Sequence, residues 1–175
     1  AYTTIDDPSA HFKIQNYTGN YSDAHAITFN DTDTNMQPDL VVSKQRDGSD
    51  AWYVSDAARG VTKTVYWDVS TAEETIAAGI QAFGSDGFTV GQNNAVNQSS
   101  ADHVAYCWKA NGSGTANSEG NTTTTKTSAN TTAGFSIITY EGDGAAATLG
   151  HGIGIKPEFL LQKNLDDAEN WQVQH

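Results

Sequence analysis

The apolar residues of this chain recur in short runs with the two-residue period of β-strands. Phe12 and Ile14 alternate with polar neighbours, and the other runs are aromatic or β-branched and bounded by Gly, Asn, Asp or Ser. Several short strands at such spacing predict an all-β fold, an antiparallel β-sandwich. The predicted strands lie at residues 12–16, 40–42, 52–54, 62–67, 87–90 and 103–109.

Residues 70–82 are the one segment that also fits a helix. Ser70 followed by Glu73 has the spacing of a capping box, and Ile76 and Ile80 lie four residues apart. Gly79 interrupts this pattern, because glycine disfavours helix interiors. A loop between strands is therefore the alternative to a helix.

The chain also carries an internal repeat. Residues 12–20 match residues 135–143 at an offset of 123, with Phe, Ile, Tyr and Gly in common. Residues 38–44 match residues 157–163 at an offset of 119, and a tryptophan follows the shared lysine by eight residues in both copies. A polar loop that is longer in the first copy explains the change of offset. The repeated anchor residues are Tyr17, Pro38 and Trp52, matched by Tyr140, Pro157 and Trp171.

This repeat predicts how the chain is divided. We expect a complete β-sandwich unit at residues 1–120, a Gly/Ser/Thr/Asn-rich connector at 121–134, and the first strands of a second, truncated unit at 135–175. The small polar tract from 111 to 132 is typical of a linker or an extended connector. The incomplete copy should fold back onto the first unit, pair with a neighbouring subunit, or remain disordered.

Composition and charge narrow the range of partners. The 175 residues include 21 acidic and 9 basic ones, for a formal charge of -12, which disfavours nucleic acid as a partner. No apolar run approaches the roughly 18 residues of a membrane-spanning helix, so membrane insertion is not expected. The single cysteine excludes an intrachain disulfide, and the hydrophobic fraction of 37% is low. Stability must therefore come from packing or from assembly.

One loop has a pattern typical of calcium ligands. Asp31, Asp33 and Asn35 occupy the first, third and fifth positions of a calcium-binding loop. Met36 stands where such a loop needs glycine, and Val42 stands where it needs the bidentate glutamate, which excludes an EF-hand. A looser surface calcium site and a solvated polar loop remain as alternatives, and no other cofactor is expected.

No pattern for catalysis stands out. The adjacent carboxylates at 6–7 and 73–74 do not converge on a strand or on a helix, and the chain has no nucleophile elbow or phosphate-binding loop. Cys107 lies in an alternating strand, which indicates a packed thiol rather than a nucleophile. Trp67 and Tyr106 are candidate glycan-contact residues, because aromatic faces suit the C–H surfaces of sugars, whereas the repeated tryptophans are expected to anchor the core.

A series of motifs carries a resemblance to a known family. The motifs lie at residues 17–20, 37–41, 85–91, 104–112 and 129–137, in this order. As a set they resemble a repeat family found in structural, tail-fibre-like proteins of tailed bacteriophages, often marine ones. The resemblance implies lectin-like jelly-roll units, similar to concanavalin or laminin-G modules, with no catalytic residues.

The expected function follows from the repeat and this resemblance. We expect a non-enzymatic structural protein of the virion, a tail fibre or a capsid-surface fibre that acts in host attachment. Its partners would be other virion proteins, copies of itself, or carbohydrate on the host surface. The alternatives are a free lectin or a glycan-active enzyme on the same sandwich, and a self-assembling adhesin or filament subunit.

Overall fold

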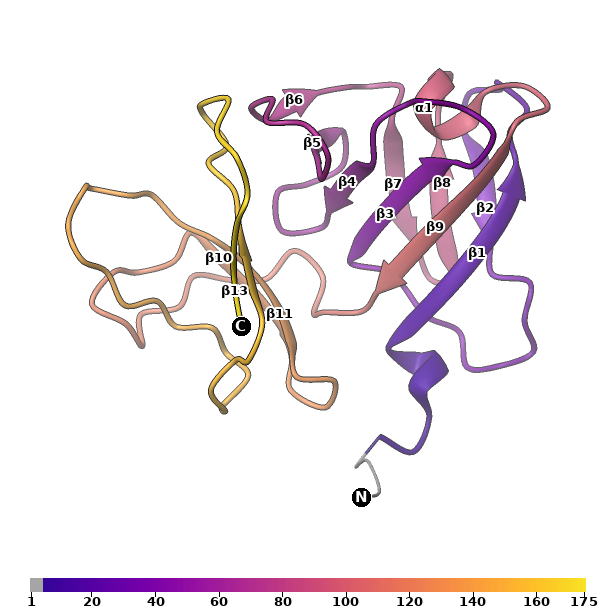
Figure 1. Cartoon of the computed structure of the whole chain (residues 1–175). Helices are drawn as coiled ribbons and strands as arrows, with labels where there is room; N and C mark the ends of the chain where they lie inside the picture. The colour runs from indigo at the N-terminus through magenta and orange to yellow at the C-terminus, as the bar shows by residue number, and fades with distance from the viewer. Residues whose placement is uncertain (1–4) are drawn as a thin grey trace.

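The first copy of the repeat folds into two antiparallel sheets, seen on the right of Figure 1. The computed structural model describes residues 5–175, so the first four residues of the expected unit at 1–120 lie outside the described residues. A short 3-10 helix (Pro8–Ala10) precedes the first strand. The larger sheet contains, in spatial order, β1 (Phe12–Thr18), β9 (Asp102–Trp108), β3 (Leu40–Gln45), β4 (Tyr53–Asp56), β5 (Lys63–Tyr66) and β6 (Glu74–Thr75).

The smaller sheet covers one face of the larger one. It consists of β2 (His25–Thr28), β8 (Gly87–Val90) and β7 (Ile80–Gly84), and the helix α1 (Asn94–Asn97) follows it. The facing surfaces of the two sheets form the main core, so the predicted antiparallel β-sandwich is confirmed. The core contains Ile27, Phe29, Met36, Val41, Tyr53, Ile80, Phe88, Val90, Val96, Ala105 and Cys107.

The central strand β8 needs glycine at its first position. Gly87 has a φ of 133° and follows the two-residue turn between β7 and β8. A Cβ atom at this position would lie 2.0 Å from the carbonyl oxygen of Ile27 on the neighbouring strand. Only a residue without a side chain allows the two strands to approach this closely.

Strand β9 separates small residues from aromatic ones. Ala105 and Cys107 are fully buried in the main core, whereas Tyr106 and Trp108 lie on the opposite face of the same strand. Burial raises the pKa of the Cys107 thiol, so it stays protonated at neutral pH. Cys107 is therefore a packed, unpaired thiol.

Of the two alternatives for residues 70–82, the helix does not form. Its backbone bonds to the larger sheet instead: Glu74 and Thr75 pair with β5 as strand β6, and the amide of Ile76 donates to the carbonyl oxygen of Thr62 at 2.7 Å. Ile80 then begins β7 in the core. Strand partners thus prevail over local helix propensity, which Gly79 had already weakened.

The second copy repeats part of the first copy's sheet. It contributes β11 (Phe135–Thr139), which pairs with β10 (Lys126–Asn130) of the connector, and β12 (Leu160–Gln162), which pairs with β13 (Gln172–Gln174). Leu161 pairs with Val173, just as Val42 pairs with Val54 in the first copy, so both hairpins have the same register. These strands lie beside the sandwich, on the left of Figure 1.

The connector differs from the expectation in one respect. Lys126–Asn130 forms β10, so the small polar tract does not serve only as a linker between the copies. Thr115 also forms a bridge to Thr127, which extends the pairing around β10. Threonine favours strands when a neighbouring strand supplies hydrogen bonds, and the turn before β11 brings that neighbour close.

The burial of one core histidine makes the stability of the fold depend on pH. His103 is fully buried, and its ring stacks on Tyr17 with ring centroids 5.1 Å apart. Burial lowers the pKa of His103 more than the carboxylates of Asp47, Asp50 and Asp102 and the backbone of Gln98 raise it. The unfolded chain therefore binds a proton on this histidine at a higher pH than the folded chain does.

Protonation of His103 should therefore not lower the free energy of unfolding above the unfolded histidine pKa of about 6.5. The free energy of unfolding should fall as the pH drops below that value. We expect a His103→Phe variant to lose this part of the pH dependence, measured as urea midpoints at about pH 7.5 and about pH 5. A His175→Phe variant is the control, because His175 is exposed. An unchanged pH dependence in His103→Phe would contradict the assignment.

Candidate functional site

The outer face of the larger sheet is apolar, although it faces away from the main core. On β1, Lys13 and Gln15 point inward and are buried, whereas Phe12 and Ile14 point outward. Ile14, Tyr106, Val42, Val54 and Val65 form one row across five strands. We call this outer surface and the rings on it the aromatic face.

The rings of the aromatic face touch one another in a chain. Trp108 is at its centre, with ring centroids 4.8 Å from Phe12 and 6.5 Å from Trp67. Trp67 lies 6.3 Å from Trp52, which in turn lies 6.0 Å from Tyr106. Tilted and edge-on contacts of this kind each stabilise a structure by about 0.5–1.5 kcal/mol beyond the area they bury.

The second copy of the repeat covers part of this face. Trp171 and Leu165 pack on the cluster formed by Val42, Val54 and Val65. The indole N–H of Trp171 donates to the carbonyl oxygen of Tyr66 at 2.6 Å. Because Trp52 packs on the same cluster, the two repeated tryptophans share one contact region.

Backbone and ring contacts extend the docking. The amide of Glu73 donates to the carbonyl oxygen of Leu165 at 2.8 Å. The ring of Phe135 stacks on Trp108, with centroids 6.4 Å apart. The side-chain amide of Asn130 donates to the carbonyl oxygen of Lys109 at 3.1 Å. The second copy is thus attached to the first at both ends.

A buried ion pair supports the segment that receives the second copy. The guanidinium of Arg59 donates to Asp56 at 2.5 Å, to Glu73 at 3.2 Å and to the carbonyl oxygen of Val54 at 3.0 Å. Asp56 and Arg59 are almost inaccessible to solvent. This pair links the end of β4 to the segment after β5, which carries Trp67.

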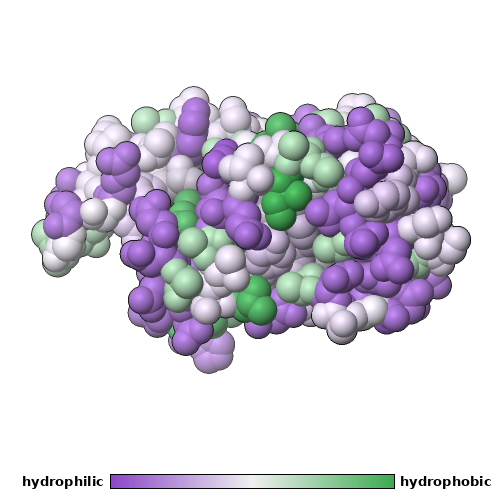
Figure 2. Space-filling model, turned by 90° about the horizontal axis from the view of Figure 1, so that it is seen from above, coloured by the Kyte–Doolittle hydropathy of each residue, from purple (hydrophilic) through white to green (hydrophobic). Residues whose placement is uncertain are grey.

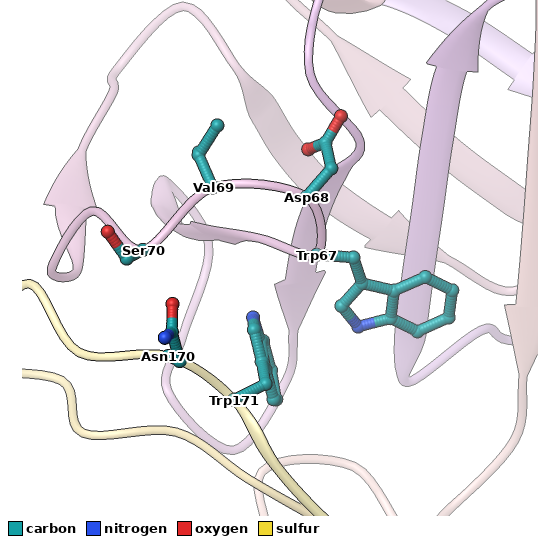
Figure 3. Close-up of a pocket in the computed structure, with 6 residues that line it drawn as sticks. All are labelled: Trp67, Asp68, Val69, Ser70, Asn170 and Trp171. Carbon is teal, nitrogen blue, oxygen red and sulfur yellow. The ribbon is translucent and has the colours of Figure 1, made fainter.

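A small open hollow lies where the two copies meet. Its volume is about 270 Å³, and its walls are residues 67–70 from the first copy together with Asn170 and Trp171 from the second. Figure 3 shows the chain of Trp67, Asp68, Val69 and Ser70 passing above Asn170 and Trp171. Both rings and polar groups are therefore present at its rim.

The two candidate glycan-contact residues differ in their surroundings. Trp67 is 36% exposed and lines this hollow. Tyr106 is half-buried against Trp52 and the valine cluster, and it does not line the hollow. The structure thus places one of them, and not both, at a recess open to solvent.

The candidate calcium loop is engaged in other contacts. The carboxylate of Asp31 accepts a hydrogen bond from Lys13 at 2.7 Å and another from the backbone of Asp33. Asp33 and Asn35 are exposed. Among residues 5–175, no group of three or more His, Cys, Asp or Glu side chains is arranged to hold a metal ion.

The adjacent glutamates are likewise directed to separate partners. Glu73 contacts Arg59 and also Lys63, at 3.3 Å. Glu74 accepts a hydrogen bond from the hydroxyl of Tyr66 at 2.7 Å. Their two carboxylates therefore do not form an acid–base pair over a common recess.

The face seen from above has a mixed character. Figure 2 shows hydrophilic residues and residues of intermediate hydropathy over most of this face, with small apolar spots near its middle. In the part of the chain that the structure covers, no helix is long and apolar enough to cross a membrane. Exposed apolar residues include Ile155, Phe159, Leu160, Leu161 and Val173 of the second copy.

The architecture defines the class of this protein: an antiparallel β-sandwich with residues of the second copy packed on its outer face. The chain belongs to a family described as a domain of unknown function (DUF7483), whose model matches residues 7–175. No match was found among curated proteins or among solved structures.

Several residues of the aromatic face were not predicted from the sequence. Phe12 was identified only as a strand residue, and Trp108 and Phe135 were not singled out, although Phe12 and Ile14 alternate in the same way as Tyr106 and Trp108. That shared alternation was the available signal, because residues two apart on paired strands lie on one face.

Proposed function

We propose that this protein is a non-catalytic structural module in which successive repeats dock through an aromatic face. The observation that carries the proposal is the contact of Trp171, from the second copy, with the valine cluster of the first. A docked repeat gives a fixed geometry between units, which an extended fibre needs. The separate engagement of Glu73 and Glu74 supports a role without catalysis.

We further propose that the assembly is part of a bacteriophage virion, as a tail fibre or capsid-surface fibre. The support is the motif resemblance together with the repeat-on-repeat docking. Mass spectrometry of purified virions, at copy numbers comparable to other fibre proteins, is the test. Absence of the chain from purified particles, combined with its presence in the soluble fraction of infected cells, would contradict this location.

A carbohydrate-binding role is the second candidate, and the hollow between the copies favours it. Trp67 offers a ring that is partly open to solvent, and Asp68, Ser70 and Asn170 offer polar groups at the rim. Sugar recognition in proteins combines such a ring with hydrogen-bonding side chains. The substrate class would be a neutral or amino sugar, because the chain is strongly acidic.

We expect Trp67→Ala and Asn170→Ala each to lower glycan-array binding by about tenfold or more, since each removes one type of contact. Val69→Ala is the matched control, because Val69 lines the same hollow but offers neither a ring nor a polar side chain. An array with no bound glycan, or equal binding by all three variants, would contradict the carbohydrate-binding role. The structural role would then be the remaining candidate.

A further inference from the structure

The second copy has apolar strands whose counterparts in the first copy are buried. Leu161 is 41% exposed and Val173 is 59% exposed, whereas the matching Val42 and Val54 are 0% and 3% exposed. The hairpins have the same register, so the difference does not come from the strands themselves. Val42 and Val54 of the first copy are covered by Trp171 and Leu165, and Val42 also lies on a strand that pairs with β9.

In the first copy, β9 lies between β1 and β3 and pairs with both. The counterparts of β1 and β3 are β11 and β12. Among residues 5–175, β11 pairs only with β10, and β12 pairs only with β13. The second copy therefore contains counterparts of both neighbours of β9. Among residues 5–175, no counterpart of β9 itself pairs with them.

Backbone hydrogen bonds show which edge of β11 is occupied by β10. It is not the edge that corresponds to the β9-facing edge of β1. In the first copy, the amide of Lys109 donates to the carbonyl oxygen of His11, so odd-numbered residues of β1 face β9. In the second copy, the amide of Thr125 donates to the carbonyl oxygen of Thr139, which matches the even-numbered Asn16. Because alternate residues point to opposite edges, β10 lies on the side of β11 away from the missing strand.

The corresponding edge of β12 is open as well. The amide of Arg46 donates to the carbonyl oxygen of Asp102, so even-numbered residues of β3, such as Val42, face β9. Leu161 matches Val42, and its backbone points away from β13. Gln162 contacts the hydroxyl of Tyr140 just past the end of β11, so the two hairpins already touch at one point.

We propose that the free edges of β11 and β12 together accept one extended strand with the residue pattern of β9. That pattern places small residues on one face, as Ala105 and Cys107 do, and aromatic ones on the other, as Tyr106 and Trp108 do. Pairing would join β10, β11, the added strand, β12 and β13 into one sheet. Strand addition of this kind gains affinity from backbone hydrogen bonds and specificity from alternate side chains.

The test uses a fluorescent peptide with the sequence of residues 102–110, added to the full chain under reducing conditions. We expect saturable binding by fluorescence anisotropy, no binding of a scrambled peptide, and slower hydrogen exchange at the amides of Ile138 and Leu161 on addition of the peptide. These amides face the proposed strand, so their protection locates it without any substitution.

A variant pair sharpens the result. Leu161→Pro removes a backbone donor that faces the proposed strand, and we expect it to weaken peptide binding by about tenfold or more. Leu161→Val keeps the donor and should bind like the wild type. This inference rests on the proposed structural role and adds a partner strand to it. The contact of Trp171 with the first copy tests the structural role separately.

Two outcomes would overturn the inference. One is the absence of peptide binding while Trp171 remains docked. The other is sedimentation showing a dimer that Leu161→Pro dissociates while the peptide has no effect, because the occupant would then be β12 of a second copy.

Discussion

Replacing Arg59 by methionine is expected to lower the free energy of unfolding by about 3–5 kcal/mol, because it leaves buried carboxylates without their partner. Arg59 contacts Asp56, Glu73 and the carbonyl oxygen of Val54, and its side chain is only 7% exposed. Methionine fills much of the same space but donates no hydrogen bond. Urea unfolding followed by tryptophan fluorescence measures the change.

The matched control for this variant is Arg46→Met. Arg46 is exposed, so its replacement should change the free energy of unfolding by less than about 0.5 kcal/mol. The two variants lose the same charge and gain the same side chain. Equal midpoints for both would show that the buried ion pair does not support the sheet in the way described.

Replacing Trp171 by alanine is expected to release the second copy from the aromatic face. A fully buried tryptophan replaced by alanine costs about 3–5 kcal/mol, and for this half-buried one we expect about 2–3 kcal/mol. The indole also loses its hydrogen bond to the carbonyl oxygen of Tyr66. The released segment should be cut faster by trypsin at Lys163, while the first copy stays resistant.

Val173→Ala serves as the control for the docking variant. Val173 lies two residues further along the same segment and is 59% exposed, so its replacement removes little contact with the first copy. We expect cleavage at Lys163 to proceed as in the wild type. Faster cleavage in both variants would indicate that strand β13, rather than the docking contact, controls access to this site.

Strands with a clear local pattern were predicted from the sequence, whereas strands that depend on a pairing partner were not. The strand at 87–90 was predicted with its observed limits, since Gly87 and the preceding turn residues mark its start. Strands β2 and β7 were missed, because their sequences have weak alternation and acquire their form from the partner β8. The helix considered at 70–82 failed for the same reason: the edge of β5 offered hydrogen bonds that a local pattern does not reveal.

The candidate site was only partly predictable. The repeat identified Trp52 and Trp171 as equivalent residues that pack in a core, but it did not reveal that both pack on the same cluster. The polar residues Lys13 and Gln15 are buried while Ile14 is exposed, which reverses the usual expectation. Lys13 is buried because Asp31 neutralises it and the ring of Phe29 lies beneath it. Such pairings depend on residues distant in the sequence.

Hydrogen exchange at the tryptophan indoles is the most direct test of repeat-on-repeat docking. The chain has four tryptophans, so each indole N–H signal can be assigned by single substitution in a nitrogen-15 NMR spectrum. We predict that the indole of Trp171 exchanges slowly, because it donates to the carbonyl oxygen of Tyr66. Exchange of the Trp171 indole at the rate of free tryptophan would show that the second copy does not dock on the aromatic face.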